Sequence, residues 1–198
     1  MEKPCSASAE RNKVAILSVL KEIFADCQHV LEFGSGTGQH AVYFAEKMPW
    51  LHWQTGDRKQ QHGAILAWLA DAGLLNCARP LDLDVDADQW SCDQYDGIFT
   101  ANTLHILSWQ QVERLFEKIS LHLKEQGKLA LYGPFNYEGK FTSESNAEFD
   151  VWLKGNDPLS GIRDFEDIIE LAGQYSLLLE EDVMMPANNR LLVLTKKN

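Results

Sequence analysis

The chain has 198 residues, which is enough for one domain with a full hydrophobic core. Its 18 basic and 29 acidic residues give a net charge of −11, and an acidic surface repels the phosphate backbone of nucleic acids. The sequence contains no run of about 18 apolar residues, so we expect no membrane span. The N-terminal sequence lacks the apolar stretch of a secretory signal. We therefore expect a cytoplasmic protein, a monomer or homodimer, that acts on a small molecule and binds neither nucleic acid nor membrane.

Helices and strands are expected to alternate along most of the chain, because helix-like and strand-like hydrophobic spacings follow one another. The expected helices cover residues 11–25, 38–48, 59–72, 109–124 and 163–172. The expected buried strands cover residues 29–33, 51–55, 79–85, 95–101 and 127–133. Such alternation predicts a parallel sheet with helices on both faces.

Two further apolar runs, at 175–185 and 190–196, are separated only by the sequence PANN. This connection is too short for a crossover helix, so the two runs must form an antiparallel hairpin. The sequence therefore predicts a single α/β domain over residues 1–198 with a mostly parallel, seven-stranded sheet. A parallel sheet that closes with such a hairpin resembles the Rossmann-like fold of class I methyltransferases.

The sequence VLEFGSGTG, residues 30–38, joins a predicted strand to the helix after it. Its glycines allow positive φ and a close approach of the backbone to a ligand, while the helix N-terminus offers free N–H groups to an anion. A dinucleotide fingerprint would need glycine where Gln39 stands. The pattern instead resembles the first motif of class I methyltransferases, so we expect it to bind S-adenosylmethionine and the product S-adenosylhomocysteine. The expected contacts are Glu32, Gly34, Ser35, Gly36, Thr37 and Gly38.

Polar residues also follow the next predicted strands, at the sheet edge where α/β folds bind ligands. Asp57, with Arg58 beside it, is expected to accept the ribose hydroxyls, although an aspartate there can also cap the next helix. Asn102 is expected near the sulfonium. By resemblance to class I methyltransferases, Asp84 and the N–H of Val85 would contact the adenine. Within the run DLDVDAD the register stays open, and Asp82 and Asp86 are the alternatives.

His105 and Tyr137 are the candidate catalytic residues, because each could accept a proton from a methyl acceptor. His105 could equally be a helix-start histidine that hydrogen-bonds to a carbonyl. The N/D-P-P-Y/F motif of many nitrogen methyltransferases does not occur. The four cysteines lack zinc-ligand spacing, so no metal site is expected.

Residues 134–163 form a long polar segment beside the expected ligand crevice, and such segments often carry specificity or act as a lid. Residues 1–28 are expected to place a helix over the site. The candidate substrate-binding residues are Arg11, Asn12, Asn136, Ser145, Asn146, Asp150, Arg163 and Asn188. We further expect four side chains to gather around one cavity, namely Arg11, His105, Asn146 and Arg163.

Several short motifs occur together in a fixed order: RNK, GSGTGQHA, NTLHI, LYGPF, SNAEFD, SGIRD and MPANN. Together they resemble the domain-of-unknown-function 938 family, also called methyltransferase-like 26. The resemblance spans nearly the whole chain and implies a class I fold with S-adenosylmethionine binding, but it supplies no substrate. We therefore expect an S-adenosylmethionine-dependent methyltransferase (EC 2.1.1.-) with a small-molecule acceptor. The alternatives are a protein that binds S-adenosylmethionine or S-adenosylhomocysteine without turnover and, less favoured, an NAD-dependent oxidoreductase.

Overall fold

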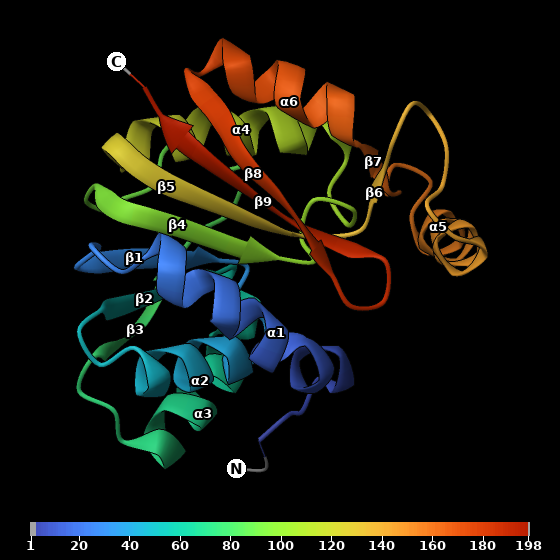
Figure 1. Cartoon of the computed structure of the whole chain (residues 1–198). Coiled ribbons are helices and arrows are strands. Elements are labelled where there is room, and N and C mark those ends of the chain that lie inside the picture. Colours follow the sequence, from blue (N-terminus) through green and yellow to red (C-terminus); the bar gives the residue numbers. More distant parts are fainter. Residues whose placement is uncertain (1–2, 198) are drawn as a thin grey trace.

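A seven-stranded sheet crosses the middle of the protein in the order β3-β2-β1-β4-β5-β9-β8 (Figure 1). The structure, a computed structural model, describes residues 3–197. Neighbouring strands from β1 to β5 are parallel, whereas β9 runs antiparallel to both β5 and β8, which confirms the predicted hairpin. The strands of this sheet are β1 His29–Phe33, β2 His52–Asp57, β3 Cys77–Asp82, β4 Tyr95–Ala101, β5 Leu123–Gly133, β8 Leu177–Met185 and β9 Asn189–Lys196.

Helices cover both faces of the sheet, as its burial on both sides requires. Figure 1 shows α1, α2 and α3 on one face and α4 and α6 on the other. One core lies under each layer, with Ile16 and Phe44 in the first and Leu115 and Phe116 in the second. The helices are α1 Ala7–Ile23, α2 Gln39–Lys47, α3 His62–Ala72, α4 Trp109–His122, α5 Glu144–Asn156 and α6 Phe165–Gln174, with the short 3₁₀ turn η1 Lys59–Gln61 before α3.

The helix α5 lies to one side of the sheet, next to the β8–β9 turn (Figure 1). The sequence pattern did not predict it, because its buried face is mostly polar. Asn146, Asp150 and Leu153 are its buried residues, at helical spacing, so hydrophobic periodicity is weak. A local signal was present: the Ser143 hydroxyl caps the helix by accepting from the N–H of Asn146 at 3.1 Å.

Several predicted boundaries were wrong, and three of them bear on candidate site residues. The strand expected at 79–85 covers Cys77–Asp82, so that Asp84 and Val85 lie in the turn after it. The helix expected from Arg163 begins at Phe165, because Arg163 and Asp164 form the short strand β7, which pairs with β6 Phe135–Asn136. The first helix begins at Ala7 rather than at Arg11, with Ser6 as its N-cap.

No helix within residues 3–197 is both long enough and apolar enough to cross a membrane.

Candidate functional site

Two cavities lie at the carboxyl ends of the parallel strands and share Asn102 in their lining. The first, of about 600 Å³, lies against the glycine loop between β1 and α2, and the second, of about 900 Å³, lies under α1 and α5. We call them the loop cavity and the helix cavity. Asn102 follows β4 in the left-handed region with φ of 57°, and its N–H donates to the carbonyl of Tyr132 at 2.8 Å. Asparagine adopts this region more readily than most non-glycine residues.

The glycine loop is tied to the end of β2 by backbone hydrogen bonds. The N–H groups of Gly34 and Ser35 donate to the carbonyl of Gly56 at 2.9 and 3.1 Å. Gly36 has φ of 57°, and a Cβ added there would meet no atom within 4 Å. Gly38 has φ of 89°, and its added Cβ would lie 3.0 Å from the Cα of Ile65. The loop therefore leaves open space at Gly36 and packs against α3 at Gly38.

Of the six residues expected to bind through this loop, only Gly34 and Gly36 line the loop cavity. The Ser35 hydroxyl accepts from the N–H of Gly56 at 3.1 Å, and the Thr37 hydroxyl donates to Gln39 at 3.0 Å. These side chains hold the loop in shape.

Glu32 lies beneath the glycine loop, 2% exposed, and its carboxylate accepts from the Trp53 indole N–H at 3.2 Å. Burial raises the pKa of this carboxyl to about 7, because the surroundings penalise its charged form. Glu32 does not line the loop cavity. It is a buried acid behind the loop that sits close to the balance between its neutral and charged forms at neutral pH.

Asp57 places its carboxylate at the wall of the loop cavity, with Arg58 next to it. Its two oxygens accept from the backbone N–H groups of Gly36 and Arg58, each at 2.7 Å. Each carboxylate oxygen can accept a second hydrogen bond, so Asp57 keeps capacity for two hydroxyl groups of a ligand. Asp57 is half-buried, and it does not cap α3, because the N-cap of that helix is Gln61.

The acidic run after β3 divides between different environments. Asp84 and Val85 line the loop cavity, whereas Asp82 ends β3 outside it. Asp86 also lines the cavity, but its carboxylate already binds Gln111 at 2.6 Å and Arg114 at 2.5 Å. Within the described chain, the carboxylate of Asp84 accepts only one hydrogen bond, from the N–H of Asp86 at 2.9 Å. Asp84 is thus the acid of this run that stays free for a ligand.

His105 lines the helix cavity, 6% exposed, on the turn between β4 and α4. An atom placed as a Cβ on Gly133 would lie 3.8 Å from its Nδ1 and 4.0 Å from the Oδ1 of Asn102, so these two polar atoms converge on one point. Burial, with a smaller effect from Arg163, lowers the pKa of His105 to about 4. The imidazole is therefore neutral at pH 7 and able to accept a hydrogen bond.

Three of the four residues expected to cluster do so. The helix cavity is lined by Ser8, Arg11, Asn12, Asn102, His105, Tyr132, Pro134, Ser145, Asn146, Phe149, Trp152, Pro186, Ala187 and Asn189. Arg163 is not among them, because its guanidinium donates to the backbone carbonyls of Leu104, Leu107 and Leu159. Nor does it pair with the neighbouring acids Asp164 and Asp167.

Asn12 joins α1 to the rest of the helix cavity. Its side chain lies 2.7 Å from Nε2 of His40, which is buried on α2. It also lies close enough to the hydroxyl of Tyr132 on β5 to lower the pKa of that group, which burial raises more strongly. This contact between three elements holds α1 over the cavity.

Three other candidates for substrate contact lie elsewhere. Asp150 accepts from the N–H of Ile162 at 2.8 Å and from Lys154 at 2.6 Å, so it fastens the end of α5 to the chain that follows. Asn136 is buried on β6, where it is in register with Asp164. Neither residue lines either cavity. Asn188 accepts at its carbonyl from the Asn146 amide at 3.2 Å, which connects α5 to the hairpin turn.

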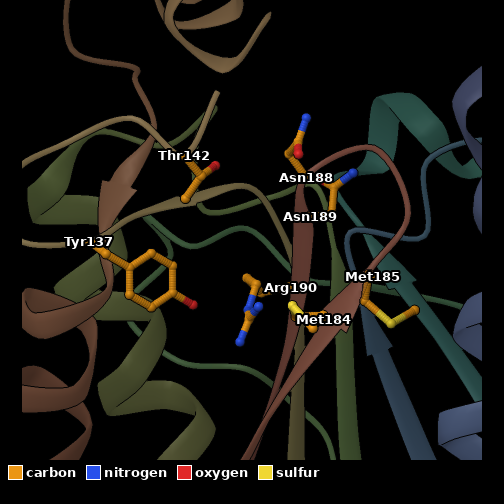
Figure 2. Close-up of a pocket in the computed structure, with 7 residues that line it drawn as sticks. All are labelled: Tyr137, Thr142, Met184, Met185, Asn188, Asn189 and Arg190. Atoms are coloured by element: carbon orange, nitrogen blue, oxygen red, sulfur yellow. The ribbon is translucent and has the colours of Figure 1, made fainter. Parts of the chain in front are cut away.

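Tyr137 belongs to a third cavity of about 370 Å³, separate from His105. Figure 2 shows its ring facing Arg190, with Met184 and Met185 on β8. The Tyr137 hydroxyl donates to Asp182 at 2.8 Å, and Asp182 also accepts from Arg190 at 2.7 Å. Burial, with a smaller effect from Asp182, raises the pKa of the Tyr137 hydroxyl above its usual value. This hydroxyl is engaged in a structural network and does not face the helix cavity.

Several lining residues were not predicted from the sequence. Phe149 and Trp152 lie three residues apart on α5 and stack with ring centroids 5.8 Å apart, a spacing that an α-helix assignment would have revealed. Gln111 lines the loop cavity from the first turn of α4, where it also forms a capping box with Ser108. Tyr132 and Asn189 carry no local signal, because only strand pairing brings them to the cavity.

Solved structures of methyltransferases share this fold. An O-methyltransferase family protein from Burkholderia thailandensis matches with a TM-score of 0.83 at 15% identity, over 94% of this chain and 56% of that chain. An O-methyltransferase family 2 protein from Planctomyces limnophilus, in complex with apigenin, gives 0.82 at 17% identity over 96% and 57%. NcsB1, an O-methyltransferase from neocarzinostatin biosynthesis in complex with S-adenosylmethionine and 2-hydroxy-5-methyl naphthoic acid, gives 0.80 at 15% identity over 96% and 54%.

The chain therefore has the α/β fold of class I methyltransferases, as its sequence predicts, and spans a little more than half the length of these three proteins. A family model matches residues 3–196. The chain belongs to the family described as protein of unknown function (DUF938), which confirms the family expected from its sequence motifs.

Proposed function

We propose that the protein is an S-adenosylmethionine-dependent methyltransferase that acts on a small molecule bound in the helix cavity. The observation that carries this proposal is the junction of the two cavities at Asn102. A methyl donor in one cavity and an acceptor in the other would meet there, beside the neutral imidazole of His105. The solved methyltransferases with this fold support the proposal.

The loop cavity has a donor set that fits S-adenosylmethionine. Open space at Gly36 admits a ligand against the backbone. Asp57 has acceptor capacity for ribose hydroxyls, and Asp84 with the N–H of Val85 offers one acceptor and one donor to an adenine edge. Asn102 would lie nearest the sulfonium. When bound, this cofactor supplies an activated methyl group.

Within the helix cavity, the chain positions the acceptor and excludes water. Holding an acceptor atom in line with the methyl group can supply a large part of the acceleration in such transfers. His105 would accept the proton that a hydroxyl loses as its oxygen bonds to the methyl carbon. A base at this point favours O-methylation, which is also the activity named for the solved proteins.

Two measurements test the proposal. S-adenosylhomocysteine, but not NAD, should raise the melting temperature of the full chain. Isotope-labelled S-adenosylmethionine should then transfer its methyl group to a component of a metabolite extract. If S-adenosylhomocysteine binds but extracts from several sources give no labelled product, the proposal of an enzyme would be contradicted. The alternative of a binding protein without turnover would then remain.

A further inference from the structure

The helix cavity and the loop cavity differ sharply in charge. Four aspartates line the loop cavity, at positions 57, 84, 86 and 157. By contrast, no aspartate or glutamate lines the helix cavity among the residues that the structure describes, and Arg11 is its one permanently charged lining residue. In a chain of net charge −11, this cavity thus has a local charge that favours an anionic ligand.

Arg11 has no acidic partner within residues 3–197. The adjacent acid on α1, Glu10, forms its ion pair with Lys13 instead. The guanidinium of Arg11 is exposed on α1 and lines the helix cavity. Its planar fork suits a carboxylate or another oxyanion, which it can bind with two parallel hydrogen bonds.

The opposite part of the cavity is aromatic. Phe149 and Trp152 are stacked with an interplanar angle of 13°, and His105 meets the edge of Phe149 at a centroid distance of 5.2 Å. Trp152 stays 62% exposed although it lines the cavity. Flat aromatic walls bind planar rings, and a large exposed indole is the kind of surface that a ligand covers.

His105 provides a polar anchor that the protein itself leaves free. His105 is 6% exposed at the cavity wall, and within residues 3–197 its ring nitrogens form no hydrogen bond. In the described chain, the side-chain atoms that are fully buried without a partner are Asn136 Oδ1 and Asp164 Oδ1, so the ring nitrogens of His105 are reachable from the cavity and can bind a ligand hydroxyl.

We infer that the methyl acceptor is a planar aromatic hydroxy acid, whose hydroxyl lies at His105 and whose oxyanion lies at Arg11. This rests on the proposed function, since it specifies the acceptor of the same site. An anion bound there would also favour the protonated imidazole, so that His105 can take the hydroxyl proton while the new O–C bond forms and the C–S bond of the donor breaks. The products are the methyl ether, S-adenosylhomocysteine and the proton on His105.

Matched probe pairs test this inference through binding rather than turnover. The full chain saturated with S-adenosylhomocysteine is titrated with 6-hydroxy-2-naphthoate and with 6-hydroxy-2-naphthamide, and 4-hydroxybenzoate with its amide forms a smaller pair. We expect the acid of at least one pair to bind about tenfold or more tightly than its amide, as a charge-assisted pair with arginine would give. 4-Hydroxyphenyl phosphate in the same titration distinguishes a carboxylate preference from a general oxyanion preference.

The Arg11→Gln variant should lose this preference while it keeps its affinity for S-adenosylhomocysteine. Arg79→Gln is the matched control, because it removes the same charge from an exposed position on β3 outside the lining. Equal binding of acid and amide, binding of neither acid, or an unchanged preference in Arg11→Gln would overturn the inference. Failure of S-adenosylhomocysteine to bind would instead contradict the proposed function, so the two failures are distinguishable.

Discussion

Gly161 and His105 are joined through their backbones, because the N–H of Gly161 donates to the carbonyl of His105 at 2.9 Å. The chain that follows α5 is thereby fixed to the turn that carries the candidate base. Arg163 reinforces this connection by donating to the carbonyls of Leu104 at 3.2 Å and of Leu159 at 3.0 Å. Two residues of the polar segment thus position His105 without touching the helix cavity themselves.

Replacing Arg163 tests this positioning role. Arg163→Gln should lower the free energy of unfolding by about 1–3 kcal/mol, because it leaves the half-buried carbonyls of Leu104 and Leu107 without their donor. It should also raise the pKa of His105, since Arg163 contributes to the lowering. Urea denaturation and NMR titration of the imidazole measure the two effects, and Arg163→Lys should retain part of both. Stability and imidazole pKa that both stay at wild-type values would contradict the role.

Replacing the candidate base tests the chemistry. His105→Gln should reduce methyl transfer by about 100-fold or more, because a positioned base contributes about that much to proton transfer. The affinity for S-adenosylhomocysteine should stay within about twofold of the wild type, since His105 does not line the loop cavity. Transfer of labelled methyl groups and calorimetric titration give the two readings. A parallel loss of cofactor affinity would mean that His105 supports the fold of the site instead.

Two glycines of the loop, Gly36 and Gly38, should respond differently to replacement by alanine. Gly36→Ala should cost only about 1–2 kcal/mol of stability, the usual cost of a left-handed alanine, because its Cβ meets open space. It should weaken S-adenosylhomocysteine binding at least about tenfold, since that space belongs to the loop cavity. Gly38→Ala should cost more stability than Gly36→Ala, because its Cβ would press on the backbone of Ile65 at 3.0 Å. Denaturation and titration of both variants check this order, and the reverse order of stabilities would be inconsistent with the loop geometry.

The buried carboxyl of Glu32 should make stability depend on pH. Its pKa is about 7 in the folded chain, against an unfolded value near 4.5, so its stabilising contribution is present below about pH 4.5 and lost as pH rises through 7. Glu32→Gln should therefore be more stable than the wild type at pH 8, by up to about 3 kcal/mol, and equal to it near pH 4. Denaturation of both proteins at the two pH values gives the comparison. A variant less stable than the wild type at pH 8 would show that the charge itself is needed.

The buried histidines His40 and His105 should make stability depend on pH in the opposite direction to Glu32. Burial lowers the pKa of both His40 and His105 to about 4, below the unfolded value of 6.5. The contribution of each is fully present above about pH 6.5 and is lost as pH falls toward 4, by up to about 3 kcal/mol. Consequently, His105→Gln should lose less stability than the wild type between pH 7 and 5. Urea titrations at these two pH values measure the difference, and equal losses in both proteins would mean that His105 already carries its charge in the folded state.

The hydrophobic spacing of the sequence predicted most helices and strands, and the short PANN connection predicted the closing hairpin. Both are local properties, since periodicity and connection length act within a few residues. The pattern failed at α5, whose packing depends on the buried polar residues Asn146 and Asp150. Polar contacts of this kind exist only once the helix reaches its partners, so no periodicity signals them.

The sequence by itself determined the family, the α/β class and the glycine turn, because glycines and apolar runs constrain the backbone wherever they stand. Tertiary structure alone decided which polar residues share a cavity. It brought Arg11, His105 and Asn146 together from α1, the β4–α4 turn and α5. It also turned Arg163 toward backbone carbonyls and Tyr137 toward Asp182. The direction of a side chain depends on the packing of distant elements and on the backbone groups that need a partner, and neither is encoded in the local pattern.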